Sequence, residues 1–216
     1  MLKGLLFDWD GTLCDSLPVC VGAFRMTIQR YTGVELSTEE IMDHFGMNEK
    51  GILELKLKDR PEIWAEALED YNVNYRKLHE KVRAPFPGLK ELIADMRRSG
   101  VKVGLVTGKG EVSCAISLEM TGLFDAFDFV RTGSDKCLNK VESIRIFLDK
   151  FSLAPEDVYY VGDAASDVAQ AKEAGVHSIA VTWNCIVDKE GIEREKPEEV
   201  FKEVSEFNKY LNGLLK

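Results

Sequence analysis

The sequence has few of the residues that bind metals through sulfur or imidazole. Among its 216 residues there are three His and five Cys. The histidines are isolated and no two cysteines form a C-x-x-C pair, so a His-rich metal site is not expected and a thiolate zinc site is the less favoured interpretation. The odd cysteine count indicates reduced thiols that pack mostly as small buried hydrophobes.

The sequence also lacks long hydrophobic runs and an excess of positive charge. No apolar stretch reaches the ~18 residues of a membrane span. The apolar run Leu5-Leu6-Phe7 stops at Asp8 and Asp10, which is atypical of a secretory signal, so we expect a cytoplasmic protein. The net charge of −9 makes nucleic acids and membrane surfaces unfavourable partners. A small anionic substrate needs a local cation or a set of backbone N–H groups.

Short apolar runs alternate with helical patterns along most of the chain. Apolar runs without polar alternation are typical of strands buried on both faces of a parallel sheet. Alternation with helix-length stripes predicts an α/β fold with a doubly wound, Rossmann-like parallel sheet. The predicted strands are Leu2–Phe7, Val101–Val106, Phe127–Arg131, Val158–Val161 and Ser178–Thr182. The predicted helices are Leu89–Met96, Val112–Met120, Val141–Phe151, Val168–Ala171 and a terminal stripe from Val200 to Leu214.

One stretch after the first strand has helical patterns only. Ser16 is placed to cap a helix that stops at Gly33, Ser37 opens a capping box, and Pro61 starts a long helix. We therefore predict an α-helical cap at residues 16–83, inserted into a Rossmann-like catalytic core of residues 1–15 and 84–216. Such a cap would act as a lid over the carboxyl edge of the sheet, where ligands of open α/β sheets bind.

The strongest chemical signal is Asp8-Trp9-Asp10-Gly11-Thr12-Leu13, directly after the first strand. Two carboxylates this close repel each other unless a cation binds them or one takes up a proton. Hard carboxylate oxygens suit Mg²⁺. An acidic loop that only solvates a strand end is the alternative, and the motif context favours function.

This segment, with Asp15-Ser16, resembles motif I of the haloacid dehalogenase-type phosphohydrolases. The other motifs of that family follow in order: Thr107-Gly108-Lys109 after a strand, Lys140 at the start of a helix, and Gly162-Asp163-Ala164-Ala165-Ser166-Asp167 after a later strand. The resemblance covers the whole chain. It implies phosphatase activity with a lid arrangement similar to phosphoglycolate phosphatase-like members.

The resemblance also implies roles for these residues. Asp8 would attack phosphorus and Asp10 would be the acid and base, with a raised pKa and a side chain directed away from the metal. Mg²⁺ would be bound by Asp8, Asp163 and the Asp10 carbonyl, with Asp167 more plausibly behind these ligands. Thr107, Gly108 and Lys140 would bind the phosphoryl group.

Several assignments stay open at this stage. Lys136 competes with Lys140 for the lysine role, Asp163 could make an Asx-turn, and Asp167 could cap a helix. Gly108 stands where the family usually has Asn. Lys109 belongs to a stretch that departs from the P-loop pattern and is interpreted as a helix-entry residue. The aromatic residues Trp64, Tyr71 and Tyr75 are expected in the core.

The function could also differ within or outside the family. A small phosphorylated metabolite is the expected partner, and a pyrophosphatase is an alternative. Sugar mutases of the family usually have a His where this chain has Cys20. A receiver-like phospho-accepting module is the alternative from another class, although it lacks a helical insert. The sequence does not predict the oligomeric state.

Overall fold

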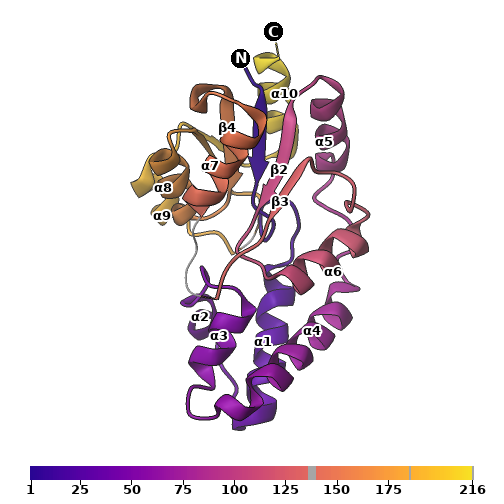
Figure 1. Cartoon of the computed structure of the whole chain (residues 1–216), viewed down its shortest axis with the longest axis vertical. Helices are drawn as coiled ribbons and strands as arrows, with labels where there is room; N and C mark the ends of the chain where they lie inside the picture. Colours follow the sequence, from indigo (N-terminus) through magenta and orange to yellow (C-terminus); the bar gives the residue numbers. More distant parts are fainter. Residues whose placement is uncertain (136–139, 185, 216) are drawn as a thin grey trace.

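Six short strands pair in parallel into one sheet in the computed structural model, which describes residues 1–135, 140–184 and 186–215 (Figure 1). The strand order is β3-β2-β1-β4-β5-β6. Because the chain winds outward from β1 in one direction and then from β4 in the other, a crevice opens between β1 and β4 at their carboxyl ends. The strands are β1 (Gly4–Phe7), β2 (Lys102–Val106), β3 (Phe129–Arg131), β4 (Val158–Gly162), β5 (His177–Val181) and β6 (Glu199–Phe201).

Helices cover both faces of the sheet, because successive side chains of each buried strand point to opposite faces. Leu5 and Phe7 pack with one group of helices, and Leu6 packs with another. The first group comprises α5 (Leu89–Arg98), α6 (Glu111–Thr121) and α10 (Val204–Leu214), and the second α7 (Lys140–Phe151) and α8 (Ala165–Ala174). A short helix α9 (Lys189–Glu195) packs against α8. This doubly wound α/β architecture is the fold that the sequence predicts.

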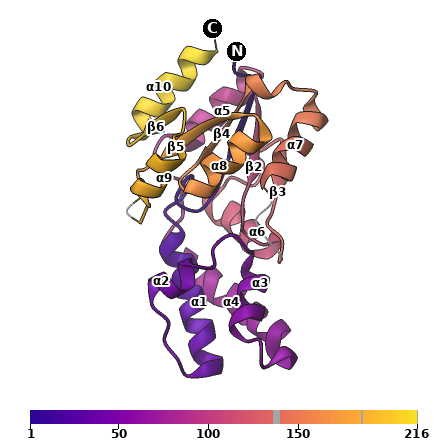
Figure 2. The same cartoon turned by 90° about the vertical axis from the view of Figure 1, so that its left-hand side faces the viewer.

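The segment between β1 and α5 is helical, with its own hydrophobic cluster. It contains α1 (Leu17–Thr32), α2 (Thr38–Met42), α3 (Glu49–Lys56), a 3-10 turn (Pro61–Ile63) and α4 (Trp64–His79). Phe24 of α1 packs on Tyr71 of α4 with ring centroids 4.5 Å apart. These helices gather beyond the carboxyl ends of the strands, at the lower end of the molecule in Figures 1 and 2.

The chain crosses between the sheet and these helices at two neighbouring points. The first follows Leu13 and the second precedes Phe86, and the Phe86 N–H donates to the Leu13 carbonyl at 2.8 Å. The division into a cap of residues 16–83 and a core of residues 1–15 and 84–216 stays a prediction.

Local signals in the helical segment have mixed outcomes. The capping box at Ser37 is confirmed, and α1 ends at Gly33 in a left-handed conformation with φ of 73°. Ser16 occupies the N-cap position of α1, but its side chain makes no cap hydrogen bond. The expected cap was wrong because the Ser16 hydroxyl instead donates to Asp10 Oδ1 at 2.7 Å.

The C-terminal region differs from the sequence-based expectation. The apolar stripe predicts Val200 in the terminal helix, but Val200 lies in the edge strand β6 and is 45% exposed. The strand is held by parallel backbone pairing with β5, which an apolar pattern does not reveal. The helix α9 was also not predicted.

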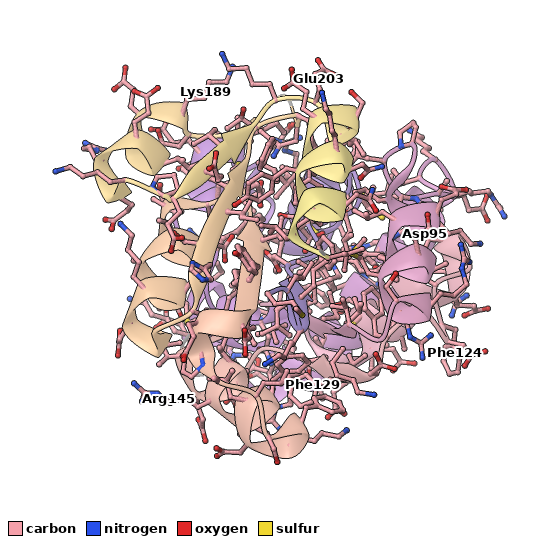
Figure 3. All side chains as sticks on the ribbon, turned by 90° about the horizontal axis from the view of Figure 1, so that it is seen from above. Asp95, Phe124, Phe129, Arg145, Lys189 and Glu203 are labelled. Carbon is pink, nitrogen blue, oxygen red and sulfur yellow. The ribbon has the colours of Figure 1, made fainter. Side chains whose placement is uncertain are left out.

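Charged side chains are found at the edge of the core. Seen from above, the labelled side chains Asp95, Arg145, Lys189 and Glu203 lie at the periphery, and Phe124 is 69% exposed (Figure 3). None of the described helices combines the length and the apolar character that crossing a bilayer requires.

Cys14, Cys20 and Cys114 are buried free thiols, as expected, whereas Cys137 and Cys185 lie outside the described residues.

Candidate active site

One cavity of about 370 Å³ lies between the carboxyl ends of the strands and the helices α1–α4. Asp8 follows β1, Thr107 follows β2 and Asp163 follows β4, and all three line this cavity. Parallel strands present their carboxyl ends at the same edge, so the topology itself brings these three segments together. The remaining sequence-predicted site residues, Asp10, Gly108, Lys140 and Asp167, line the same cavity.

The turn after β1 positions its two carboxylates on different sides. Gly11 adopts φ of 76°, which permits the sharp turn, and the Trp9 carbonyl accepts hydrogen bonds from Leu13 N and Cys14 N. Thr12 Oγ1 donates to Asp163 Oδ1 at 3.1 Å and ties this turn to the loop after β4. Asp8 thereby faces Lys140 and Asp163, while Asp10 turns toward Ser16.

Three carboxylates form a cluster that suits a divalent cation. Asp8, Asp163 and Asp167 each offer an oxygen, and these oxygens lie within 4.8 Å of one another. Burial, followed by the charges of Asp167 and Asp8, raises the pKa of Asp163 well above its ordinary value. Asp8 Oδ1 is buried and has no hydrogen-bond partner among the described residues. A hard cation would satisfy this oxygen and offset the mutual repulsion, so the donor set fits Mg²⁺.

Lys140 connects two members of this cluster. Its Nζ lies 3.0 Å from Asp8 Oδ2 and also contacts Asp167 Oδ1. Burial opposes its charge, but Asp167 and Asp8 raise the pKa of Lys140 well above its ordinary value, so it stays cationic. Burial raises the pKa of Asp8 to about 6, against the opposing effect of Lys140. Lys136, the competing lysine of the sequence analysis, lies outside the described residues.

Asp167 has two partners, one for each interpretation of the sequence. Its Oδ1 receives Lys140, and its Oδ2 accepts a hydrogen bond from Ala164 N at 3.2 Å at the start of α8. It therefore contributes to the N-terminus of the helix and also holds the lysine beside Asp8. Its side chain is 1% exposed.

Asp10 has an environment that the sequence did not predict. Lys109 Nζ lies 3.2 and 3.3 Å from its two oxygens, and Ser16 and Cys20 also donate to Oδ1. Burial would raise the pKa of Asp10, but Lys109 and these hydrogen bonds lower it below its ordinary value. The expected raised pKa was therefore wrong in this state of the protein. The side chain of Asp10 is directed away from the acidic cluster, toward Lys109.

Lys109 is more than a helix-entry residue. Its side chain is 1% exposed and its Nζ lies 4.3 Å from the centre of the Tyr75 ring on α4. A buried lysine needs such partners, because an unpaired charge is costly away from water. Tyr71 and Tyr75 are fully buried, as expected, and Trp64 is half-buried. Tyr71 also lines the cavity, which core packing alone does not predict.

The loop after β2 supplies the candidate phosphate-binding groups. Thr107 is buried, and its hydroxyl accepts a hydrogen bond from Lys109 N at 3.3 Å. Gly133 packs directly against the Gly108 backbone, and its N–H donates to the Lys109 carbonyl at 2.7 Å. A Cβ at Gly133 would clash with the Gly108 carbonyl oxygen, so only glycine allows the segment at Gly133 to pack this closely against the loop after β2.

Two further residues of the site were missed. Asn184, two residues beyond the end predicted for the fifth strand, donates to Asp163 Oδ2 at 2.7 Å and to the Gly11 carbonyl at 3.1 Å. The rule that applies to Asp8 and Asp163, a polar residue just after a buried strand, could have found it. Glu49 of α3 accepts hydrogen bonds from Gly110 N and Ser113 Oγ at the start of α6, and no local pattern reveals that contact.

The chain is similar to known proteins along most of its length. Residues 5–181 match the family model described as haloacid dehalogenase-like hydrolase. A protein assigned as the pyrophosphatase PpaX in Caldanaerobacter subterraneus subsp. tengcongensis is 28% identical, over 98% of this chain and 96% of its own length. The phosphoglycolate phosphatase of Nitrosospira multiformis is 29% identical, over 84% of each chain.

Solved structures share the fold. A β-phosphoglucomutase from Clostridium difficile superposes with a TM-score of 0.80 at 20% identity, covering 100% of this chain and 97% of that one. The family model spans most of the chain. The chain therefore belongs to the haloacid dehalogenase-like hydrolase family.

Proposed function

We propose that this haloacid dehalogenase-like hydrolase is a Mg²⁺-dependent phosphatase that cleaves small phosphate monoesters through an aspartyl-phosphate. The observation that carries the proposal is the buried, unpartnered Asp8 Oδ1 at the cavity wall, beside Lys140 and the carboxylates of Asp163 and Asp167. A carboxylate oxygen in that position is available for phosphorus or for a cation. The curated relatives named as phosphatases and pyrophosphatases support the same reaction class.

The reaction divides into two displacements at phosphorus. A carboxylate oxygen of Asp8 forms a bond to phosphorus while the ester P–O bond breaks, and Asp10 gives a proton to the departing alcohol oxygen. Water then attacks the phosphorus of the aspartyl-phosphate while Asp10 takes up its proton. Inorganic phosphate leaves and the Asp8 carboxylate is restored.

Asp8, Asp163 and the Asp10 backbone carbonyl would hold the metal, with Asp167 behind them on Lys140. A bound Mg²⁺ supplies charge stabilisation for the phosphoryl oxygens. Thr107, the Gly108 backbone and the cationic Lys140 would bind the remaining phosphoryl oxygens. Lys140 then also answers how an acidic protein accepts an anionic substrate.

Asp10 must carry a proton when it acts as the acid. The state described here has it paired with Lys109, which favours the carboxylate. A phosphate dianion entering the cavity brings negative charge beside Asp10 and so raises its pKa. Residues 16–83 would serve as the cap that keeps water out of the cavity during this step.

Pyrophosphate is a second candidate substrate, because a relative over nearly the whole chain is assigned as a pyrophosphatase. In that reaction phosphate replaces the alcohol as leaving group and the roles of Asp8 and Asp10 stay the same. A mutase is less favoured, because Cys20 is buried against Asp10 and Lys109 where such members usually have a histidine.

The test is phosphate release from p-nitrophenyl phosphate with and without Mg²⁺. Asp8→Asn is expected to abolish turnover, whereas Asp43→Asn, an exposed aspartate outside the cavity, is a matched control with unchanged activity. Mass spectrometry of acid-quenched wild-type enzyme should find phosphate on the peptide that contains Asp8. Normal turnover by Asp8→Asn would refute the proposed nucleophile, and an inactive wild type across metals and pH would refute the phosphatase.

A further inference from the structure

Part of the cavity wall that the helical segment contributes is apolar. Six side chains form it, and we call them the apolar pouch. They come from α1, α2, the loop that follows α2, and α3, and are Leu17, Phe24, Met42, Phe45, Met47 and Ile52. Leu17, Phe24 and Ile52 are buried and the other three are half-buried, so the pouch is a packed surface that borders the cavity.

The charged side chains of the described residues around the cavity are mostly carboxylates. Among the described residues that line it, the only cations are Lys109, paired with Asp10, and Lys140, paired with Asp8 and Asp167. The other charged lining side chains are all carboxylates. One of them, Glu49 of α3, is buried and accepts hydrogen bonds from Gly110 N and Ser113 Oγ.

We infer that the leaving group of the physiological substrate is an uncharged, mainly apolar alcohol, seated in the apolar pouch. The inference rests on the proposed phosphatase function and narrows its substrate class to alkyl or aryl phosphate monoesters. Hydrolysis converts such an ester and water into the free alcohol and inorganic phosphate. Phosphoglycolate and pyrophosphate fit poorly, because their leaving groups carry a carboxylate or a phosphate into an apolar and acidic surrounding.

The dimensions agree with this class of substrate. A cavity of about 370 Å³ falls in the range of pockets that enclose small organic ligands. The side chains of the pouch border the same cavity as Lys140 and the strand ends, where the phosphoryl group would bind. Phe24 and Tyr71, whose rings pack together, give that part of the cavity an aromatic surface.

The test compares kcat/KM, measured by phosphate release, for ethyl, propyl, butyl and hexyl phosphate with kcat/KM for 2-phosphoglycolate and pyrophosphate. The alcohols that leave from these alkyl esters have nearly equal acidity, so differences in kcat/KM among the esters reflect contacts of the alkyl chain with the pouch. We expect kcat/KM to rise about fourfold per buried methylene. Propyl phosphate should exceed 2-phosphoglycolate, which is of similar size, by at least about tenfold.

A pair of variants tests the location. Met42→Lys puts a cation into the pouch and should raise kcat/KM for 2-phosphoglycolate relative to propyl phosphate by about tenfold or more. Met26→Lys makes the same change on α1 at a 41% exposed position outside the cavity, and should leave the ratio unchanged. Lys136 lies outside the described residues, so Lys136→Ala tests whether it supplies a cation for the leaving group. A tenfold or larger fall in kcat/KM for 2-phosphoglycolate relative to propyl phosphate would overturn the apolar leaving group.

The outcomes separate the two proposals. A wild type that hydrolyses none of these esters and no p-nitrophenyl phosphate refutes the phosphatase. A wild type that prefers 2-phosphoglycolate or pyrophosphate, or shows no dependence on chain length, overturns the apolar leaving group and leaves the phosphatase standing. The substrate series uses unmodified protein, so it decides the matter even if Met42→Lys does not fold.

Discussion

Replacement of Lys109 by methionine isolates the charge that neutralises Asp10. Methionine keeps an unbranched chain of similar length over the Tyr75 ring, while the ammonium group 3.2 Å from Asp10 Oδ2 is removed. The Lys109 side chain is 1% exposed and that of Asp10 is 19% exposed. The variant therefore leaves a carboxylate that is largely buried and has lost its counter-ion.

The expected loss of stability follows from the choices open to Asp10. It can stay charged and unpaired, or it can take up a proton. Protonation at pH 7 of a carboxyl group with an ordinary pKa of 3.8 costs about 4 kcal/mol, at 1.36 kcal/mol per pH unit. This is the upper limit of the protonation cost in the variant, because burial raises the pKa of the unpaired carboxyl group. Broken buried pairs typically cost 3–5 kcal/mol. Because Asp10 is partly exposed, we expect Lys109→Met to lower the free energy of unfolding by roughly 2–4 kcal/mol.

The loss should depend on pH in a defined direction. In the wild type the lowered pKa of Asp10 contributes stability at pH values above the ordinary aspartate pKa. This contribution is lost as the pH falls through the pKa of Asp10 in the folded protein. In the variant burial raises the pKa, so stability falls as pH rises above the ordinary value. Between pH 4 and pH 7 the second effect dominates, so the deficit of the variant is largest at pH 7 and smallest near pH 4.

Urea denaturation at pH 7, 5 and 4 measures this deficit. The double variant Asp10→Asn/Lys109→Met leaves no charge on either member of this pair and should be about 2 kcal/mol more stable than Lys109→Met at pH 7. Lys58→Met, at an exposed position, is the matched control and should stay within 0.5 kcal/mol of wild type. Equal instability of the single and double variants, or a deficit that is the same at pH 4 and pH 7, would refute the reasoning.

Three further predictions concern other contacts. Asn184→Ala removes the hydrogen bond to Asp163 and should raise the Mg²⁺ concentration for half-maximal activity about 10- to 100-fold; an unchanged magnesium titration would contradict it. Gly11→Ala places a Cβ against Asp163 Oδ2 at a φ of 76°, so kcat should fall about 100-fold, and normal kcat would show that the turn adapts. Burial opposes the charge of Asp128, but Val103 N and Arg97 lower its pKa, so Asp128→Asn should cost about 1 kcal/mol at pH 7. That loss should persist above the ordinary aspartate pKa and vanish in acid as the wild-type carboxyl protonates, which urea denaturation at pH 7 and pH 3 measures.

The sequence predicts well those parts of the molecule that obey short-range rules. Apolar runs place the central strands, and Asp8, Thr107 and Asp163 come directly after them. Because parallel strands end at one edge, that position alone predicts that the three side chains surround one cavity. The left-handed Gly33 and the capping box at Ser37 are equally local and were equally predictable.

The rest depends on contacts between distant segments. Lys109 lies 99 residues from Asp10, and nothing near Lys109 in the chain indicates that it pairs with Asp10 and lowers its pKa. Ser16 looked like a helix cap because the sequence does not reveal that Asp10 competes for its hydroxyl. The strand β6 contains two exposed residues, so its pattern resembles a loop or a helix until β5 provides a partner.

The two neighbouring crossings of the chain, joined by the hydrogen bond from Phe86 to Leu13, have an evolutionary consequence. The segment from α1 to α4 is connected to the sheet only through these two neighbouring crossings. The acidic cluster of Asp8, Asp163 and Asp167 lies outside that segment. Recombination at these two crossings could exchange the helices α1–α4 and leave the acidic cluster unchanged. A change in this one continuous stretch of sequence would therefore alter the cavity wall that α1–α4 contribute without moving the acidic cluster.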